Sequence, residues 1–261
     1  MLKIENTEIL GWEHAIRGMR NPMNSWDKSD SIFAHVGDDE GYNLGGNMMP
    51  FASVIHECGA DIGPNDLDLM LRLRNAGTDH RKFMRMITVY LDITAPLYWW
   101  KEFDTYKVGT VANSCSTMHK IADKKFTLED FSYEHLIQTE VGIQNNLYID
   151  CSGVHDESSI YTPFGVLCST IEMLNVCRER YLAACKTEAE TGFSAKDIWW
   201  QMIQLLPTSY NQRRTVMLNY EVLANIYKSR RNHKLDEWHT LCDWIEALPY
   251  SQLITGKEDK V

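Results

Sequence analysis

The chain has 261 residues, and its 26 basic side chains are outnumbered by 36 acidic ones, which gives a formal net charge of −10. This balance argues against binding to a nucleic-acid polymer. Such proteins usually carry a basic patch, and the basic clusters here, Arg213–Arg214 and Lys228–Lys234, are short. Apolar residues make up 44% of the chain, enough for a sizeable core. The length favours one domain, so we expect residues 1–261 to form a single domain.

The sequence also argues against a membrane protein and a metalloprotein. No segment approaches the ~18 uninterrupted apolar residues of a membrane span, and residues 1–10 lack the apolar core of a signal peptide. The seven cysteines form no Cys-x-x-Cys pair and do not cluster with histidines, so no metal site is expected. Unpatterned cysteines are typical of reduced thiols, which predicts a cytoplasmic protein.

Hydrophobic periodicity predicts strands, helices and loops in the first half of the chain. Asn65 is expected to cap a helix, and Gly77 is expected to end it. The predicted elements are a strand at 7–10, a helix at Trp12–Met19, loops at 20–31 and 37–50, a helix at Asp66–Ala76 and a strand at 86–93.

The second half is predicted to be mainly helical. Capping boxes at Thr127–Asp130 and Ser194–Asp197 mark helix starts, and Pro207 and Pro249 mark stops. The predicted helices cover about Ser169–Cys185, the stretch from Ser194 to Pro207, Thr215–Lys228 and Leu235–Leu248.

The most distinctive stretch runs from Pro96 to His119. An aromatic block at Tyr98–Trp100 is followed by charged residues and then by small polar residues from Gly109 to Thr117. Apolar bodies beside dense small donors and acceptors line many small-molecule pockets. The plainer interpretation is a buried helix followed by an ordinary loop, and composition alone leaves both open.

This stretch and its neighbours, residues 68–96 and 205–241, resemble the flavin-dependent thymidylate synthases in order and spacing. That family has an early Ala-x-Arg, here Ala15–Arg17, then a His shortly before a Phe, a strand and a Pro. An Arg-His-Arg signature and a Ser follow, and later a Leu-Pro and a helix with two Asn and an Arg.

The resemblance covers about residues 9–120 and 180–248, while residues 120–168 form an insertion or a divergent region. It implies an α/β fold of the α+β type, with a mostly antiparallel central sheet flanked by long helices. It also implies a homotetramer whose sites are shared between subunits.

The resemblance assigns flavin contacts to His80 and to Asn113, which matches an Asn beside the signature. Asn219 and Asn225 reproduce two flavin-contacting Asn residues at the family's spacing, and Arg230 matches the Arg that polarises the uracil ring. If these residues share one helix, Asn219 and Arg230 lie nearly on one face, ~16 Å apart along the axis.

The signature itself is degenerate in this chain. With Ser116 as the signature Ser, Arg-His-Arg falls on Tyr106–Val108, or on Thr105–Lys107 if the register shifts by one. The family's signature Glu becomes Ser114. Two phosphate-binding arginines are replaced by Met118 and by either Ile203 or Gln204.

These losses matter because guanidinium groups hold a nucleotide phosphate by two parallel hydrogen bonds, whereas a lysine offers charge without the planar fork. Arg231 is the alternative to Arg230 in a shifted register. The candidate substitutes for the lost phosphate contacts are Lys107, Lys120, Arg213 and Arg214, with the hydroxyls of Ser114, Ser116 and Thr117.

The resemblance implies an FAD enzyme that methylates dUMP to dTMP with methylenetetrahydrofolate and NADPH. Two alternatives stay open, because fold does not fix function. One is a flavin enzyme acting on another pyrimidine nucleotide, and the other is a non-catalytic relative that binds a nucleotide or a protein partner. The retained His80 and Arg230 favour a flavin enzyme, and the lost arginines favour the alternatives.

Overall fold

The computed structural model describes residues 1–33, 43–44, 47–48, 59–150, 160–186 and 193–257. The chain divides into two compact units. The first contains Met1, Thr94–Glu102 and Ser114–Arg213, and the second contains Leu2–Ile93, Phe103–Asn113 and Arg214–Val261. The expectation of a single domain stays a prediction. Within the described residues, no helix has both the length and the apolar character needed to cross a bilayer.

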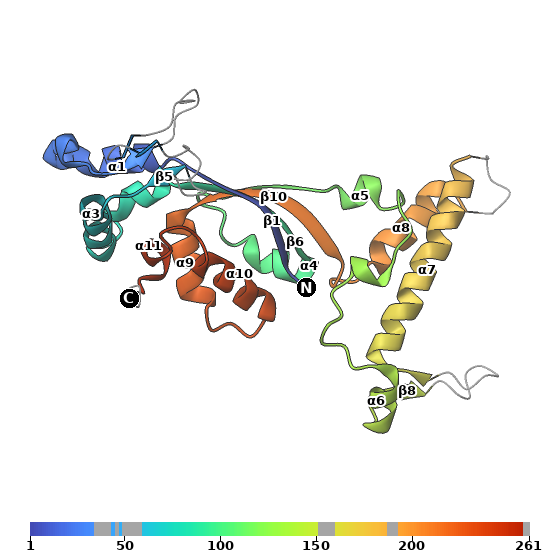
Figure 1. Ribbon diagram of the computed structural model, residues 1–261. Helices are drawn as coiled ribbons and strands as arrows, with labels where there is room; N and C mark the ends of the chain where they lie inside the picture. The colour runs from blue at the N-terminus through green and yellow to red at the C-terminus, as the bar shows by residue number, and fades with distance from the viewer. Residues whose placement is uncertain (34–42, 45–46, 49–58, 151–159, 187–192, 258–261) are drawn as a thin grey trace. The chain divides into compact units, whose positions relative to one another are not determined.

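The chain contains both helices and strands, and most of its second half is helical (Figure 1). The strands are β1 (Lys3–Leu10), β2 (Ile32–Phe33), β3 (Asn43–Leu44), β4 (Asn47–Met48), β5 (Ala60–Asp61), β6 (Thr88–Pro96), β7 (Val111–Ser114), β8 (Ile149–Asp150), β9 (Ile160–Tyr161) and β10 (Asn211–Asn219). The α-helices are α1 (Trp12–Arg20), α3 (Pro64–Asn75), α4 (Leu97–Phe103), α5 (Thr117–Lys120), α6 (Thr139–Gln144), α7 (Pro163–Ala184), α8 (Ala195–Leu205), α9 (Tyr220–Arg230), α10 (Asp236–Glu246) and α11 (Gln252–Thr255). Short 3-10 turns are η1 (Asn21–Met23), η2 (Trp26–Lys28), η3 (Arg81–Arg85) and η4 (Leu128–Asp130).

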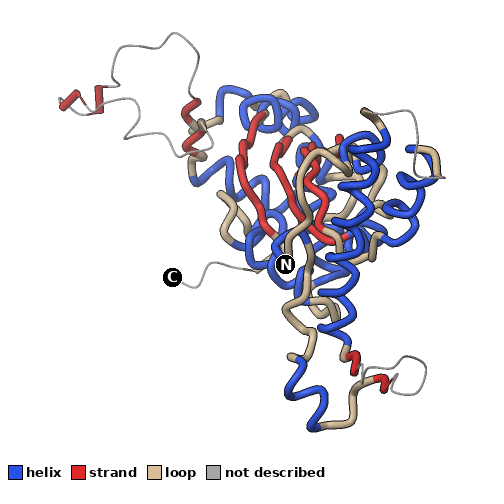
Figure 2. The backbone as a smooth tube through the Cα atoms, turned by 90° about the vertical axis from the view of Figure 1, so that its right-hand side faces the viewer, coloured by secondary structure: helices blue, strands red, loops and turns tan. Residues whose placement is uncertain are grey.

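The main sheet has four strands in the order β1-β6-β10-β7, drawn side by side in Figure 2. The start of β6 meets the end of β10, since Tyr220 N donates to Ile87 O at 3.1 Å. The end of β6 meets the start of β10, since Leu97 N donates to Tyr210 O at 3.0 Å. These two strands are therefore antiparallel. The mixture of helices and antiparallel sheet confirms the predicted fold class.

In β6, one face is buried and the other is partly exposed. In β6, Val89, Leu91 and Ile93 are at most 1% exposed, whereas Tyr90 is 40% exposed. This alternation follows from the two-residue period of a strand. Trp244 of α10 donates to Thr7 of β1 at 3.3 Å, so α10 lies against this sheet within the second unit.

The predicted helix at Thr215–Lys228 is wrong at its start, because Thr215–Asn219 belong to β10. Val216 and Leu218 are both buried, with the i, i+2 spacing of a strand. Leu218 also fits an i, i+4 series with Val222, which is why periodicity alone assigned it to a helix. Asn219 is the N-cap of α9 and does not lie on the helix face with Arg230.

Other predicted boundaries shift by a few residues. The helix predicted at Ser169–Cys185 begins earlier, at Pro163, where Thr162 caps it. The capping box at Ser194–Asp197 is confirmed, but the one at Thr127–Asp130 opens only the 3-10 turn η4. The stretch 37–50, predicted to be a loop, contains the paired strands β3 and β4, and its other residues lie outside the described part of the chain.

The first unit has its own core, formed mainly by α7, α8 and the segment before α6. Phe131, Leu174 and Met202 are at most 1% exposed. The buried cluster consists of Ile121, Ala122, Phe126, Phe131, Leu167, Ile171, Leu174 and Met202. The stretch 120–168 matches no part of the family pattern, but five of its described residues, Ile121, Ala122, Phe126, Phe131 and Leu167, belong to this packed core.

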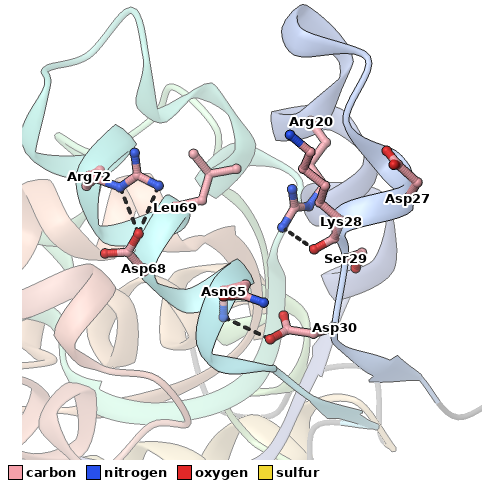
Figure 3. Close-up of a pocket in the computed structure, with 9 residues that line it drawn as sticks. All are labelled: Arg20, Asp27, Lys28, Ser29, Asp30, Asn65, Asp68, Leu69 and Arg72. Carbon is pink, nitrogen blue, oxygen red and sulfur yellow. Dashed lines mark hydrogen bonds and ion pairs between the residues drawn. The ribbon is translucent and has the colours of Figure 1, made fainter.

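A pocket of about 560 Å³ lies between α3 and the segment after α1, in the second unit (Figure 3). Several of its charged groups are already paired within the protein. Arg20 donates to Asp66 at 2.6 Å and to the carbonyls of Ser25 and Lys28 at 3.2 and 3.0 Å. Arg72 pairs with Asp68 at 2.8 Å. The polar groups here serve the fold, and the pocket is not a strong ligand site.

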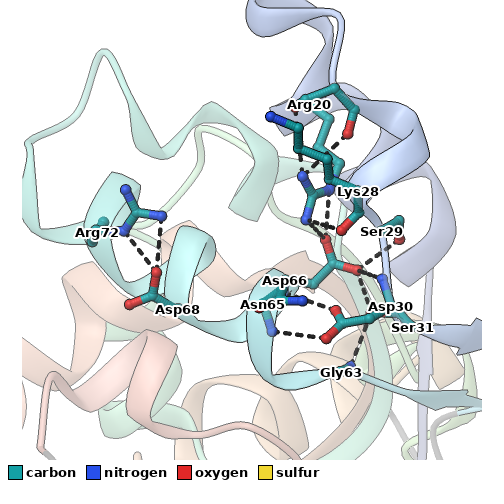
Figure 4. Close-up of polar contacts among 11 residues, drawn as sticks. Arg20, Lys28, Ser29, Asp30, Ser31, Gly63, Asn65, Asp66, Asp68 and Arg72 are labelled. Atoms are coloured by element: carbon teal, nitrogen blue, oxygen red, sulfur yellow. Dashed lines mark hydrogen bonds and ion pairs between the residues drawn. The ribbon is translucent and has the colours of Figure 1, made fainter.

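The centre of this network is the carboxylate of Asp66, which is 0% exposed (Figure 4). Ser29 and Ser31 each donate to it at 2.6 Å, opposite the Arg20 guanidinium. Asp30 then caps α3 by accepting from the N–H groups of Asn65 and Asp66 at 2.9 and 3.0 Å. The prediction that the Asn65 side chain caps this helix is therefore wrong, because the cap comes from a distant loop.

We expect Asp66→Asn to lower the free energy of unfolding by about 3 kcal/mol, because it leaves the buried Arg20 charge without its carboxylate. Chemical denaturation of the wild type and the variant measures this. Asp68→Asn is the matched control, since it removes an exposed pair on the same helix and should cost less than about 0.5 kcal/mol. Equal losses would contradict the assigned role of Asp66.

The same pair predicts a pH dependence. Burial acts to raise the pKa of Asp66, but hydrogen bonds from Ser29, Ser31 and Arg20 outweigh it and hold the pKa below its ordinary value. A lowered folded-state pKa contributes stability that is present above about pH 4 and is lost as the pH falls through that pKa. The Asp66→Asn variant should lack this part of the acid-side loss.

Candidate functional site

Three of the residues predicted to form a site, Asn219, Asn225 and Arg230, lie at the start, middle and end of α9. Asn219 Oδ1 accepts from Val222 N at 3.0 Å, so half of this amide is used to cap the helix. Gly109 lies directly beside it. Its φ is +79°, and a Cβ there would be 3.1 Å from Asn219 Nδ2, so both backbone conformation and space favour glycine.

Arg230, at the end of α9, is held by aromatic side chains. Its Nε donates to the Tyr106 hydroxyl at 2.9 Å. Its guanidinium carbon lies 5.6 Å from the Tyr106 ring centroid and 4.6 Å from that of Trp238. Phe103, which is 1% exposed, stacks on Trp238 at 6.4 Å. Hydrogen bonding and cation–π attraction together fix the guanidinium plane.

Asn225, in the middle of α9, is exposed and accepts from Arg81 at 3.3 Å. Arg81 also pairs with Glu221 at 3.3 Å, and Arg85 binds the same carboxylate. Burial acts to raise the pKa of Glu221, but Arg85 and Arg81 hold it below its ordinary value. The ionised Glu221 thus orients Arg81, and Arg81 orients the Asn225 amide.

Asn225 and Arg231 line a pocket of about 560 Å³ within the second unit. Asn75 adds a second amide to its lining. Amide and guanidinium groups are donors suited to the carbonyl and phosphate oxygens of a nucleotide cofactor. The residues that line this pocket therefore fit a nucleotide cofactor. Asn225 is the one among them that the family resemblance assigns to the flavin.

The two serines predicted to bind the nucleotide lie in the first unit. Ser116 Oγ accepts from His119 N at 3.1 Å and caps α5, while Ser114 ends β7. A pocket of about 350 Å³ is lined by Ser116, Lys120, Arg213 and their neighbours. Lys120 pairs there with Asp123 at 3.0 Å.

Lys107 lies in the second unit and is exposed. It lines a smaller pocket, of about 200 Å³, with Tyr106 and Arg214. Arg214 pairs with Asp104 at 2.7 Å. The four candidate substitutes for the lost arginines therefore fall into two pairs, Lys107 with Arg214 and Lys120 with Arg213, each lining one pocket.

The remaining predicted residues are exposed or engaged elsewhere. His80 is exposed at the start of η3, and Asn113 is exposed in β7. Arg231 pairs with Asp243 at 2.9 Å and with Glu246 at 3.2 Å. Arg17 is exposed and pairs with Glu13 at 3.8 Å, four residues earlier.

Sequence reasoning missed Arg74 and Arg81 as site residues. Both are far in sequence from α9, although Arg81 directly follows His80. Lys228 belongs to a basic cluster that the sequence analysis noted without assigning it a role. A helical projection of α9 would place Lys228 about one turn from Asn225, which is the signal that could have found it.

No protein-family model matches the sequence, and no curated protein matches it by sequence. The fold does match solved structures. A thymidylate synthase X from Helicobacter pylori with FAD and dUMP is 14% identical, with a TM-score of 0.57 and coverage of 98% of each chain. A second structure of the flavin-dependent enzyme from that organism, complexed with FAD and dUMP, is 14% identical, with a TM-score of 0.54 and coverage of 97% of this chain and 98% of that one.

A UMP/dUMP methylase from Streptomyces cacaoi bound with 5-Br dUMP also matches, at 13% identity and a TM-score of 0.48, over 98% of this chain and 95% of that one. The two Helicobacter pylori matches establish that this chain has the fold of the flavin-dependent thymidylate synthases over nearly its whole length.

We expect Asn219→Ala to cost about 1 kcal/mol of stability through the lost helix cap. Asn219→Ser should restore most of it, because a serine hydroxyl can accept the same backbone hydrogen bond. Thermal or chemical denaturation of both variants separates this capping role from any loss of ligand binding. If the Asn219→Ala variant is as stable as the wild type, Asn219 does not stabilise the helix as a cap.

Proposed function

We propose that this protein is a flavin-dependent enzyme that methylates a pyrimidine nucleotide, converting dUMP to dTMP. The observation that carries the proposal is Arg230, held by Tyr106 and Trp238 at the end of α9, in a chain with the fold of the flavin-dependent thymidylate synthases. A fixed, permanently charged guanidinium is suited to stabilise negative charge that develops on a pyrimidine ring.

The chain's own residues bind and orient the reactants. Asn219, Asn225, His80 and Asn113 would hold the flavin, and Arg81 keeps the Asn225 amide in one orientation. A flavin bound by these residues would supply the hydride that completes the methyl group at C5 of the nucleotide. Arg230 binds the pyrimidine and polarises it. The cofactor carries the organic chemistry, and the protein supplies position and charge.

The candidate contacts for the nucleotide are Ser114 and Ser116 in the first unit and Lys107 and Arg231 in the second, and each is proposed separately, since Ser116 and Lys107 line different pockets. Lysine and hydroxyl contacts lack the bidentate geometry of guanidinium groups. Binding of dUMP is therefore weaker and more sensitive to salt than in an enzyme with an arginine clamp, because exposed lysine contacts are screened.

The cosubstrates in this proposal are NADPH, as the source of electrons, and methylenetetrahydrofolate, as the source of the carbon. The protein acts in the cytoplasm as a homotetramer, with sites shared between subunits. The candidate residues lie in several separate segments of the chain, from His80 to Arg231. A monomer in light scattering at working concentration would count against shared sites.

A second candidate is a relative that acts on another pyrimidine nucleotide or binds one without catalysis. It is favoured by Tyr106, which stands in the signature region and binds Arg230 directly. Met118, exposed in α5, stands in place of a phosphate-binding Arg. A yellow protein with flavin absorbance would argue against the simple non-catalytic form.

Release of hydrogen from C5 of dUMP, assayed with FAD, NADPH and methylenetetrahydrofolate, tests the reaction. We expect it in the wild type, and we expect Arg230→Ala to reduce it by roughly 100-fold or more, as loss of one charge-stabilising donor does. Arg230→Lys is the control that keeps the charge without the planar fork.

The Lys107→Ala variant tests the contact with the nucleotide phosphate. It should weaken dUMP binding more than flavin binding. Lys101→Ala, an exposed lysine outside these pockets, should change neither. No hydrogen release in the wild type, together with no dUMP binding by calorimetry, would exclude the synthase activity.

Flavin affinity should depend on Asn225. We expect Asn225→Ala to weaken FAD binding by about 0.5–1.5 kcal/mol, the net worth of one amide hydrogen bond. The residue is exposed, so the fold should be unaffected. If fluorescence titration gives the same FAD affinity for the variant and the wild type, the assignment of Asn225 in α9 to the cofactor site is wrong.

A further inference from the structure

Residues 107–110 form a tight turn before β7, in the second unit. Thr110 N donates to Lys107 O at 3.4 Å. Gly109 has a φ of +79°, the positive value that the third residue of a type II turn requires. Val108, at the tip of the turn, is 92% exposed. The side chains at the two ends of the turn, Lys107 and Thr110, line one pocket of about 200 Å³.

The lining of this pocket has an excess of positive charge. It includes two cations, Lys107 and Arg214, and one carboxylate, that of Asp104. Asp104 pairs with Arg214 at 2.7 Å. Lys107 is exposed and makes no ion pair with any carboxylate that the structure describes. One positive charge of the lining therefore has no partner of opposite sign in the described chain, and an anionic group of a ligand would supply one.

The pocket beside Ser116, in the first unit, is balanced instead. It is lined by three cations and three carboxylates, which are Lys120, Lys124, Arg213, Asp123, Glu129 and Asp130. Lys120 pairs with Asp123 at 3.0 Å. Lys124 pairs with Asp130. A phosphate placed there would compete with carboxylates that already neutralise these lysines.

The hydroxyl groups of the two pockets differ in the same way. In the first unit, Ser116 Oγ accepts from a backbone N–H of α5 at 3.1 Å, and Thr117 Oγ1 accepts from Gln212 at 3.0 Å. In the second unit, Thr110 Oγ1 is buried and has no hydrogen-bond partner among the described residues. A buried hydroxyl without a partner is unfavourable. Thr110 as a whole is partly exposed, so rotation about its χ1 can turn the hydroxyl toward an acceptor in the pocket.

We propose that the phosphate of the pyrimidine nucleotide binds at the turn 107–110, where Lys107 and Arg214 supply charge and the Thr110 hydroxyl donates a hydrogen bond. The volume of about 200 Å³ is below the roughly 300–1,000 Å³ of sites for whole drug-sized ligands, and it suits a single phosphate group. This location departs from the family resemblance, which assigns the nucleotide contact to Ser116. The identity of the ligand rests on the proposed function, whereas its location rests on charge and hydrogen bonding.

Calorimetric titration of the full-length protein with dUMP and with deoxyuridine, which lacks the phosphate, tests this location. We expect dUMP to bind more tightly. Thr110→Val removes the hydroxyl and keeps the shape of the side chain. It should weaken dUMP binding roughly fivefold, equivalent to about 1 kcal/mol, and leave deoxyuridine affinity unchanged. Thr110→Ser keeps a hydroxyl and should retain dUMP affinity within about twofold. Equal affinity of the wild type for dUMP and deoxyuridine would overturn the proposal.

Stability separates a binding role of Thr110 from a structural one. Because its hydroxyl has no partner in the described chain, the Thr110→Val variant should unfold at the same denaturant concentration as the wild type or at a higher one. A clear loss of stability in this variant would show that the hydroxyl supports the fold, and would overturn its assignment to the phosphate.

Two lysine variants decide between the pockets. Lys107→Gln should weaken dUMP binding roughly fivefold, whereas Lys120→Gln, the same charge change beside Ser116, should alter it by less than about twofold. Lys101→Gln changes an exposed lysine outside both linings and is the control for overall charge. A larger effect of Lys120→Gln than of Lys107→Gln would overturn the proposal and place the phosphate beside Ser116.

The proposed location and the proposed activity fail in different ways. If dUMP binding depends on Lys107 and Thr110 but the wild type releases no hydrogen from C5, the phosphate site stands and the synthase activity falls. If the wild type releases hydrogen and both Lys107→Gln and Thr110→Val keep its dUMP affinity, the activity stands and the phosphate does not bind at this turn.

Discussion

The second unit depends on one fully buried residue, Tyr220, at the point where β10 becomes α9. Its N–H donates to Ile87 O at 3.1 Å, beside the start of β6, and its hydroxyl donates to Pro249 O at 2.6 Å. Its ring meets the edge of Trp12 in α1 at 5.2 Å. One residue thus ties together the sheet, through its backbone N–H, and the first helix and the C-terminal segment, through its side chain. Because α9 starts at this fixed point, regular helix geometry determines where Asn225 and Arg230 are displayed.

The signature register stays open between Tyr106–Val108 and Thr105–Lys107. Tyr106 belongs to both registers, and its hydroxyl and ring hold Arg230. If the resemblance holds at this position, a group that could contact a phosphate is replaced by one that restrains the neighbouring arginine. Positive charge occurs instead around Lys107 and Lys120, and most densely around Arg74 and Lys228. An altered distribution of phosphate contacts on an unchanged fold is consistent with a divergent substrate or a divergent way of holding the same one.

The sequence predicted well what local patterns determine. Gly77 ends α3, with φ +111°, and the capping box at Ser194–Asp197 forms as its spacing requires. The family resemblance predicted the fold class, and the structural match confirms this at only 14% identity.

The failures share a physical cause, which is contact between distant segments. Asn65 looked like a cap, but Asp30 supplies the cap because Asp66 anchors that loop to α3. Thr215–Asn219 looked helical, because Leu218 fits both a period of two and a period of four, and only pairing with β6 decides between them. Likewise, the spacing of Asn225 from Asn219 and Arg230 could not reveal that its amide is held by Arg81, which is 144 residues away in the sequence.

The pocket beside Asn225 is lined by Arg74, Arg81, Lys228 and Arg231, although the protein as a whole is acidic. This contrast affects the rates at which an anionic ligand binds and dissociates. At long range an approaching polyanion meets the repulsion of a molecule with net charge −10, and this repulsion slows association. Within about 8 Å, the screening length at physiological salt, the local cations dominate and oppose departure. Added salt weakens both fields, so association and dissociation should both quicken. For a ligand that bears phosphate, added salt would therefore raise the association and dissociation rate constants by more than the accompanying change in affinity indicates.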